Sequence, residues 1–254
     1  MASPTMPAPA EQAPAPVSSF GRIFGVFFEP KTTFESIVRR PTWVLPMLAV
    51  IVIGVVVVFL IGSRVGWRQV IDRQIASSPR AQQRMEQVPA EKREPILEKQ
   101  AKLAPIVGYV GVVVGTAVAE LIVAALLLVA FNVISGSKAQ FSASLGIVAH
   151  SWMPYVIHGL LGVLILFIKD PTTIDVQNLV ASNPGALLAD GSAKWLVSLL
   201  TSLDIFTLWV IILQAVGFRA TNPKKVSFAQ AFGIILVLWL FFVLVKVGFA
   251  AAFA

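Results

Sequence analysis

Residues 103–134 read LAPIVGYVGVVVGTAVAELIVAALLLVAFNVI, a stretch in which Glu120 is the only charged residue. A helix of about 20 apolar residues crosses the hydrocarbon core of a bilayer, so this stretch predicts a transmembrane helix. Its 32 residues exceed that length, and we expect the helix to tilt or to project into water. A carboxyl group near the centre of a bilayer is costly and often marks a functional site, which makes Glu120 the first candidate residue.

Four other apolar stretches are also long enough to cross a membrane. Hydrophobic residues make up 57% and charged residues 13% of the 254-residue chain, a composition that excludes a soluble domain. The sequence therefore predicts an all-α, polytopic membrane protein with five transmembrane helices and its termini on opposite sides. The predicted spans lie near residues 43–62, 104–135, 141–168, 195–217 and 227–250.

Several classes of function are excluded by what the sequence lacks. The chain has no cysteine, so it has neither disulfides nor thiolate metal sites. It shows no nucleophile–base pair, no phosphate loop and no complete metal motif, and we expect neither an enzyme nor a cofactor. Its net charge of +7 is spread over the loops, which suits anionic lipid headgroups better than nucleic acid.

The segment before the first span divides into two parts. Residues 1–17 are rich in Pro and Ala and predict a disordered tail. Residues 18–40 predict an amphipathic anchor lying in the membrane interface, because apolar residues recur at helical spacing beside basic ones. The anchor residues are Phe20, Arg22, Ile23, Phe24, Phe27, Arg39 and Arg40.

The distribution of Lys and Arg predicts the orientation. The short loops on the N-terminal side carry Lys138, Arg219, Lys224 and Lys225, whereas the loop 169–194 has two basic residues and three acids. Because basic loops stay in the cytoplasm, we expect a cytoplasmic N terminus and an extracytoplasmic C terminus. Residues 63–103 are also basic and oppose this assignment.

Residues 63–103 form the one long polar stretch after the first span. Ser78–Pro79 predicts a helix start there, and Pro89 and Pro95 are expected to break the run into short helices. Mixed charge predicts either a solvated helical cap outside the membrane or a surface that docks a partner.

Two helical hairpins resemble each other in sequence. Lys138-Ala-Gln-Phe141 recurs as Lys225-Val-Ser-Phe228 at an offset of 87, and Trp152 and Trp239 keep that offset. Spans two and three would then be one copy of a hairpin, and spans four and five a second copy. Such repeats occur in transporters, although Lys, Phe and Trp are also common at membrane interfaces.

Three ionisable residues are predicted at similar membrane depth, and other polar residues lie on the same helical faces. Two interpretations stay open: a cavity that binds a proton, a cation or a solute, and a structural network of interhelical hydrogen bonds. A metal site would need His150 together with Glu120 and Asp204, because His158 lies about 12 Å further along the helix axis. The candidate intramembrane residues are Glu120, His150, Asp204, Thr116, Tyr109, Thr207 and Gln214.

The order of motifs resembles the Yip family of Ypt/Rab-interacting membrane proteins, and its bacterial members in particular. The resemblance covers about residues 18–250 and rests on five stretches in order: Phe20-Gly-Arg-Ile23 to Glu29-Pro30 with Thr33-Phe34, the pair Arg39–Arg40, Lys99 to Pro105, Ser142 to Pro154, and Leu203-Asp204-Ile-Phe-Thr-Leu-Trp209 through Gly217. It implies five spans in the inner membrane with a cytosolic N terminus.

For eukaryotic relatives the family implies binding of small GTPases through a longer N-terminal region. Only 42 residues precede the first predicted span here, which leaves GTPase binding doubtful. We therefore expect a membrane-organising or protein-assembly factor that acts through helix and lipid contacts, with the lipid bilayer, a membrane-protein partner or a second copy of the chain as its partners. The alternative is a proton- or cation-coupled transporter or channel that uses Glu120, Asp204 and His150.

Overall fold

The computed structural model describes residues 18–189 and 191–252, so the predicted tail at residues 1–17 lies outside the described part. Within it the chain is helical and has no strand, which confirms the all-α prediction. The α-helices are α1 (Ser19–Phe28), α2 (Pro30–Arg39), α3 (Val44–Leu60), α4 (Trp67–Ala76), α5 (Pro79–Glu86), α6 (Ala90–Val110), α7 (Thr116–Ser135), α8 (Phe141–Ser151), α9 (Met153–Ile168), α10 (Lys194–Ser202), α11 (Ile205–Thr221) and α12 (Phe228–Ala252).

Four helical segments of the described chain are long and apolar enough to cross a membrane. They are Val44–Val65, Ala90–Ser135, Phe141–Ile168 and Phe228–Ala252. Helices α10 and α11 make a fifth span if the pair is counted as one, with a bend of 47° between them. With the bent pair counted as one span, the number of spans agrees with the predicted five. The fourth span is then broken rather than continuous.

The second and third spans contain local changes of helix geometry. The third span is interrupted at Trp152, where α8 ends and α9 begins with Pro154 in its first turn, as expected for a residue that lacks a backbone N–H donor. In the second span a π-helical turn, η2 (Gly111–Gly115), joins α6 to α7. A wide turn changes the angular register of the residues on its two sides.

The polar stretch after the first span is helical, as predicted, and it breaks at Pro89 but not at Pro95. Ser78 caps α5 by accepting a hydrogen bond from the Ala81 N–H at 3.4 Å, and Pro79 is the first helical residue. Pro95 does not break the chain and lies inside α6. The expectation of a break at Pro95 is wrong because a proline in the second turn removes only one backbone hydrogen bond, and the 46-residue helix Ala90–Ser135 continues past it.

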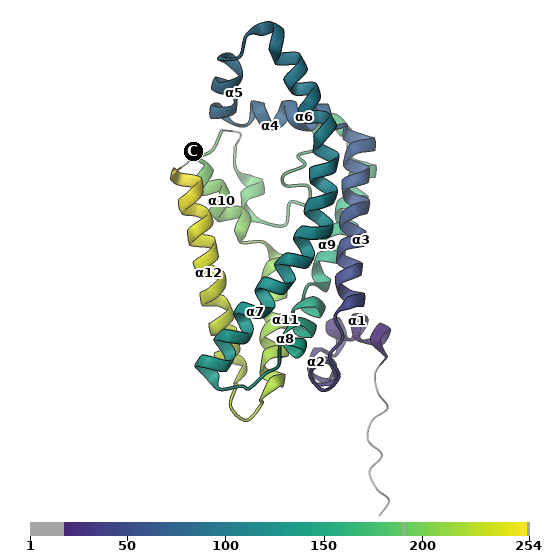
Figure 1. Cartoon of the computed structure of the whole chain (residues 1–254), viewed down its shortest axis with the longest axis vertical. Helices are drawn as coiled ribbons and strands as arrows, with labels where there is room; N and C mark the ends of the chain where they lie inside the picture. The colour runs from purple at the N-terminus through teal and green to yellow at the C-terminus, as the bar shows by residue number, and fades with distance from the viewer. Residues whose placement is uncertain (1–17, 190, 253–254) are drawn as a thin grey trace, which may run out of the picture.

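The helices form an elongated bundle with distinct ends (Figure 1). Helices α1 and α2, the α7–α8 turn and the α11–α12 turn lie together at the lower end of Figure 1, while α4, α5 and the start of α6 cap the upper end. Helix α11 packs against α2, α8 and α12. The largest group of buried apolar side chains therefore lies between these helices.

Aromatic residues dominate this core. The rings of Phe131 on α7 and Phe218 on α11 stack with their centroids 4.3 Å apart, and Phe34 on α2 is fully buried beside them. A side chain at Gly217 would place its Cβ 2.4 Å from Cγ2 of Ile147, so this position requires glycine for the close approach of α8 and α11.

The two sequence-related hairpins share one structural feature. Phe141 and Phe228, which lie 87 residues apart, are the first residues of the returning helices α8 and α12. Trp152 lies at the break between α8 and α9, however, whereas Trp239 lies inside the uninterrupted α12. The common origin of the hairpins therefore stays a hypothesis.

Candidate functional site

Glu120 lies on the buried face of α7 together with Ala124, Leu127 and Phe131. Its side chain is 0% exposed, and neither carboxyl oxygen has a hydrogen-bond partner among the described residues. Ser144 on α8 donates a hydrogen bond to the Ala124 carbonyl at 2.7 Å, which sets the register of the two antiparallel helices.

That register places Glu120 at a similar axial level to Ser151, a polar residue that is not among those predicted from the sequence. Ser151 lies seven residues beyond Ser144, and Glu120 lies four residues before Ala124, toward the same end of the helix pair. Their axial positions therefore differ by about 4.5 Å. The Ser151 hydroxyl is also buried without a hydrogen-bond partner in the described part of the chain.

His150 is fully buried on α8, and its ring is oriented by its own helix. Nδ1 donates a hydrogen bond to the Gly146 carbonyl at 2.8 Å, which leaves Nε2 without a partner among the described residues. No group of three or more His, Asp or Glu side chains in residues 18–189 and 191–252 is arranged to hold a metal ion.

The position of Asp204 differs from the predicted one. The sequence placed it in the middle of a continuous span, but it is the N-cap of α11, immediately after the break that follows α10. Oδ1 accepts hydrogen bonds from the backbone N–H groups of Phe206 at 2.9 Å and Thr207 at 3.3 Å, and Oδ2 accepts one from the Ser182 hydroxyl. A capping aspartate satisfies N–H groups that a helix start leaves unpaired, which explains this acid by local structure.

The other four predicted polar residues lie in two places, on α11 and on either side of the π-helical turn in the second span. Thr207 shares a 3.3 Å hydrogen bond with the Tyr155 hydroxyl, and the nearly buried Gln214 lies two turns further along α11. Tyr109 and Thr116 are half-buried and lie on opposite sides of the π-helical turn η2. The polar stripe expected along the second span is therefore interrupted in its angular register.

A cavity of about 160 Å³ lies between α7, α9, α11 and α12. Tyr155, Thr207 and Gln214 contribute its polar groups, and Trp152 and Trp239 contribute aromatic rings. Glu120, His150 and Asp204 do not line it. The structure thus groups two of the predicted residues, Thr207 and Gln214, around a small cavity and keeps the ionisable residues apart from it.

The predicted membrane anchor consists of helices α1 and α2, but its side chains are distributed differently from the prediction. Phe20, Phe24 and Phe28 are 64%, 55% and 82% exposed and follow one another at four-residue spacing. Phe28 was missed, although that spacing identifies it. Phe27 instead faces inward, with its ring 5.4 Å from that of Trp209 on α11.

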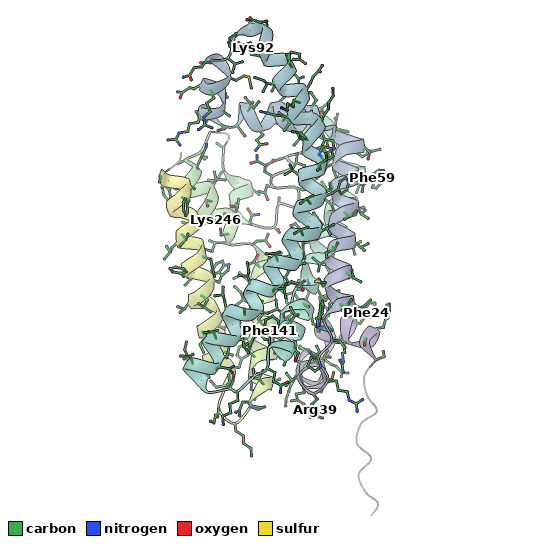
Figure 2. The ribbon with its side chains drawn as sticks, in the orientation of Figure 1. Phe24, Arg39, Phe59, Lys92, Phe141 and Lys246 are labelled. Carbon is green, nitrogen blue, oxygen red and sulfur yellow. The ribbon has the colours of Figure 1, made fainter. Side chains whose placement is uncertain are left out.

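Arg22 was expected to meet lipid headgroups, and the structure shows it buried instead. Nη1 donates hydrogen bonds to the Arg40 carbonyl at 2.7 Å and to Thr42 Oγ1 at 3.1 Å, and Nη2 donates one to the Ser36 carbonyl at 3.3 Å. The Ser36 carbonyl also accepts the backbone N–H of Arg40, and the guanidinium group of Arg22 can serve several such acceptors at once. Arg22 therefore clamps α1 to the end of α2. Arg39, labelled in Figure 2, stays exposed, and so does Arg40.

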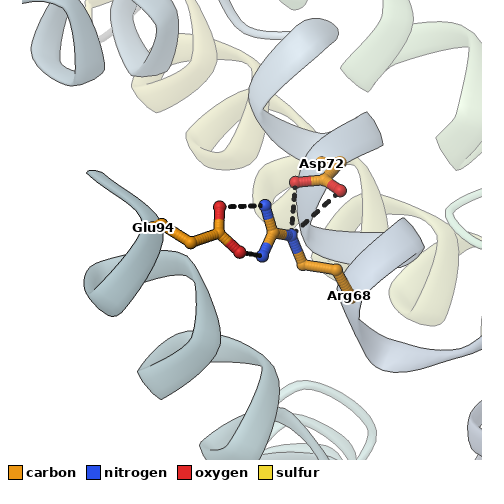
Figure 3. A network of polar contacts seen from close by, with 3 residues as sticks. All are labelled: Arg68, Asp72 and Glu94. Atoms are coloured by element: carbon orange, nitrogen blue, oxygen red, sulfur yellow. Dashed lines mark hydrogen bonds and ion pairs between the residues drawn. The ribbon is translucent and has the colours of Figure 1, made fainter. Parts of the chain in front are cut away.

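At the opposite end, Arg68 on α4 connects two helices of the polar cap (Figure 3). Its guanidinium group pairs with both carboxyl oxygens of Glu94 on α6 and with Asp72 one turn along α4. The hydrogen bonds from Arg68 lower the pKa of Glu94 and raise that of Arg68. Sequence spacing does not predict this triad, because Arg68 and Glu94 are 26 residues apart.

Comparison with known proteins agrees with this architecture. No solved structure matches the chain. A curated protein of Bacillus subtilis (strain 168), "Membrane protein YknW", is 26% identical over 230 residues, which cover 86% of this chain and 88% of that protein. A family model described as the Yip1 domain matches residues 24–248. The match extends over most of the chain, including four predicted spans completely and the fifth up to residue 248, and the chain therefore belongs to the Yip1 family of membrane proteins.

Proposed function

We propose that this chain is a membrane-organising or protein-assembly factor, without a catalytic step or cofactor, whose working surface is the face formed by α1 and α2. The observation that carries the proposal is the row of exposed phenylalanines Phe20, Phe24 and Phe28 on a helix that Arg22 clamps to the bundle. A clamped amphipathic helix keeps a constant position in one leaflet, whereas a free one would move independently of the spans.

Charge at the same end supports this proposal. Helix α2 and the two turns beside it expose basic residues, and the acids exposed or half-exposed on α1 and α2 are Glu29 and Glu35. Each basic residue near an anionic surface contributes on the order of 1 kcal/mol of attraction. The face thus combines apolar insertion with attraction to anionic headgroups. Its exposed basic residues are Lys31, Arg39, Arg40, Lys138, Arg219, Lys224 and Lys225.

The apolar sides of the spans supply the second kind of contact in the proposal. Large side chains such as Phe59, Phe167 and Phe241 are exposed on the helices that cross the membrane. They would contact lipid, another membrane protein or a second copy of this chain.

Reconstituted vesicles test the proposal. The full chain is inserted into vesicles of phosphatidylethanolamine and phosphatidylglycerol at a constant protein-to-lipid ratio, and vesicle shape is measured by cryo-electron microscopy. We expect the wild type to curve or tubulate the vesicles and the triple variant F20Q/F24Q/F28Q to lose that effect. The triple variant F20L/F24L/F28L keeps the apolar face and should behave like the wild type. Equal vesicle shapes for the wild type and the glutamine variant would refute a membrane-organising role for this face.

The transport alternative has less support. The cavity of about 160 Å³ is smaller than the usual ligand pockets of about 300–1,000 Å³, and no ionisable candidate lines it. Proton and cation flux through vesicles containing the wild type or the double variant E120Q/D204N tests this alternative. We expect no flux with either protein and normal folding of the variant. Flux with the wild type that the amide variant loses would establish transport instead, because an amide neither releases a proton nor balances a cation.

A further inference from the structure

The polar cap contains a second, partly open cavity, far from the α1–α2 face. It has a volume of about 580 Å³, within the usual range of about 300–1,000 Å³ for ligand sites, and lies between α4, α5, α6 and the start of α10. We call it the cap cavity. Its apolar lining consists of Ile71, Ile75, Ala81, Met85, Val88 and Ile96.

The charged groups of the cap cavity are all basic. Arg80, Arg84 and Lys194 line it, and no Asp or Glu does. Arg80 and Arg84 lie one turn apart on α5 and are exposed. Neither has an ion pair or a hydrogen-bonded partner among the described residues.

Other arginines of the same segment, unlike Arg80 and Arg84, have hydrogen-bond or ion-pair partners within the chain. Arg68 pairs with Asp72 and Glu94, Arg73 donates to the carbonyls of Thr172 and Ile174, and Arg93 donates to those of Glu86 and Val88. These arginines hold the cap together. Arg80 and Arg84 contribute no such contact, so their charges are free to bind a ligand.

The cap cavity is also joined to the membrane-spanning part. Lys194 Nζ donates a hydrogen bond to Ser78 Oγ at 3.1 Å, across 116 residues of sequence. Lys194 is the first residue of α10, and the exposed Trp195 follows it, so the rim of the cavity lies where the fourth span enters the hydrocarbon. Lys and Trp at such a position mark the headgroup level of a bilayer.

We propose that the cap cavity binds the headgroup of an anionic phospholipid, with the phosphate on Arg80, Arg84 and Lys194 and part of the acyl region on the apolar lining. Arginine is suited to this ligand because its planar guanidinium group donates two hydrogen bonds to phosphate. The cavity's position at the headgroup level favours a lipid over an acidic peptide, which would approach from water.

Native mass spectrometry of the full chain in detergent tests the proposal, with short-chain phosphatidylglycerol as the probe and short-chain phosphatidylcholine as the uncharged comparison. We expect phosphatidylglycerol to bind more tightly than phosphatidylcholine. In the variant R80Q/R84Q its affinity should fall roughly 30-fold, since two basic residues are removed. The variant R80K/R84K should recover part of the loss.

The matched control is K92Q/K99Q, which removes the same charge from exposed positions on α6 that do not line the cavity. It should bind phosphatidylglycerol like the wild type. Equal losses in K92Q/K99Q and R80Q/R84Q would show a general charge effect and overturn the site. So would tighter binding of glycerol phosphate, which has no acyl chain, or displacement of the lipid by an acidic amphipathic peptide at lower concentration.

Discussion

Asp204 shows at the scale of one residue how the same carboxyl group supports different interpretations. In the sequence it is an acid inside an apolar span, a pattern typical of a functional site. In the structure it caps α11 and binds Ser182, 22 residues earlier. Helix starts inside a membrane leave N–H groups that need acceptors, and a carboxyl group at the break provides them.

The capping role predicts the effect of substitutions at this position. Asp204→Asn keeps an acceptor oxygen at the cap, so the thermal stability of this variant protein in detergent should stay near that of the wild type. Asp204→Ala removes the acceptor and should cost about 0.5–2 kcal/mol. Thermal unfolding followed by circular dichroism measures both. If Asp204→Asn were as damaging as Asp204→Ala, the negative charge and not the cap would be the important property.

Arg22 has its effect at the scale of secondary-structure elements, because one side chain connects α1 to the end of α2. Replacing Arg22 with Leu leaves the carbonyls of Ser36 and Arg40 without this donor. We expect backbone amide exchange in Ser19–Phe28 to rise about tenfold, measured by hydrogen exchange and mass spectrometry of the chain in detergent, since local opening becomes easier. Arg39→Leu removes an exposed arginine and should leave exchange in α1 unchanged; an equal rise would contradict the clamp.

The triad of Arg68, Asp72 and Glu94 connects α4 to α6 and predicts a dependence on pH. Arg68 lowers the pKa of Glu94 below its ordinary value of 4.5 in the folded chain. The ion pair therefore stabilises the cap above pH 4.5, and that contribution is lost as the pH falls through the lower folded value. Because all three side chains are solvent-exposed, the effect should be small and weaken with salt.

The variant Glu94→Gln makes this pH dependence measurable. At neutral pH it should increase amide exchange in α4 (Trp67–Ala76) relative to the wild type, because the charged partner of Arg68 is gone. The difference should shrink at pH values below the folded pKa of Glu94, where the wild type is protonated as well. Glu98→Gln, an exposed acid of α6 without an ion pair among the described residues, is the control. A difference that persists in acid would mean that side-chain shape and not charge holds α4.

At the scale of the whole molecule, the two ends of the bundle should lie on opposite sides of the membrane. The chain has no cysteine, so single cysteines can be introduced and labelled without background. Because of the basic loops, Q140C and K224C should react only from the cytoplasm, and Q83C and Q177C only from outside. All four positions are exposed. The reverse labelling pattern would overturn the proposed orientation.

The sequence was a good guide to the membrane class and the span positions, and a weaker guide to the site. Apolar length predicts a span because transfer into hydrocarbon depends mainly on composition. Whether Glu120, His150 and Asp204 lie close together depends on how the helices rotate and pack, which apolar length does not give. The break before Asp204 and the π-helical turn at Gly111–Gly115 change that rotation, and neither follows from hydrophobicity.

The sequence by itself determined that this protein is helical, crosses a membrane several times and resembles the Yip family, because these properties depend on apolar length and local motif order. Only the tertiary structure decided which polar groups meet. Arg22 binds the end of α2, Asp204 binds Ser182, and Arg80 and Arg84 are left free beside Lys194. Hydrogen bonds and ion pairs act over a few ångströms between residues far apart in the chain, so their partners are set by the packing of the helices.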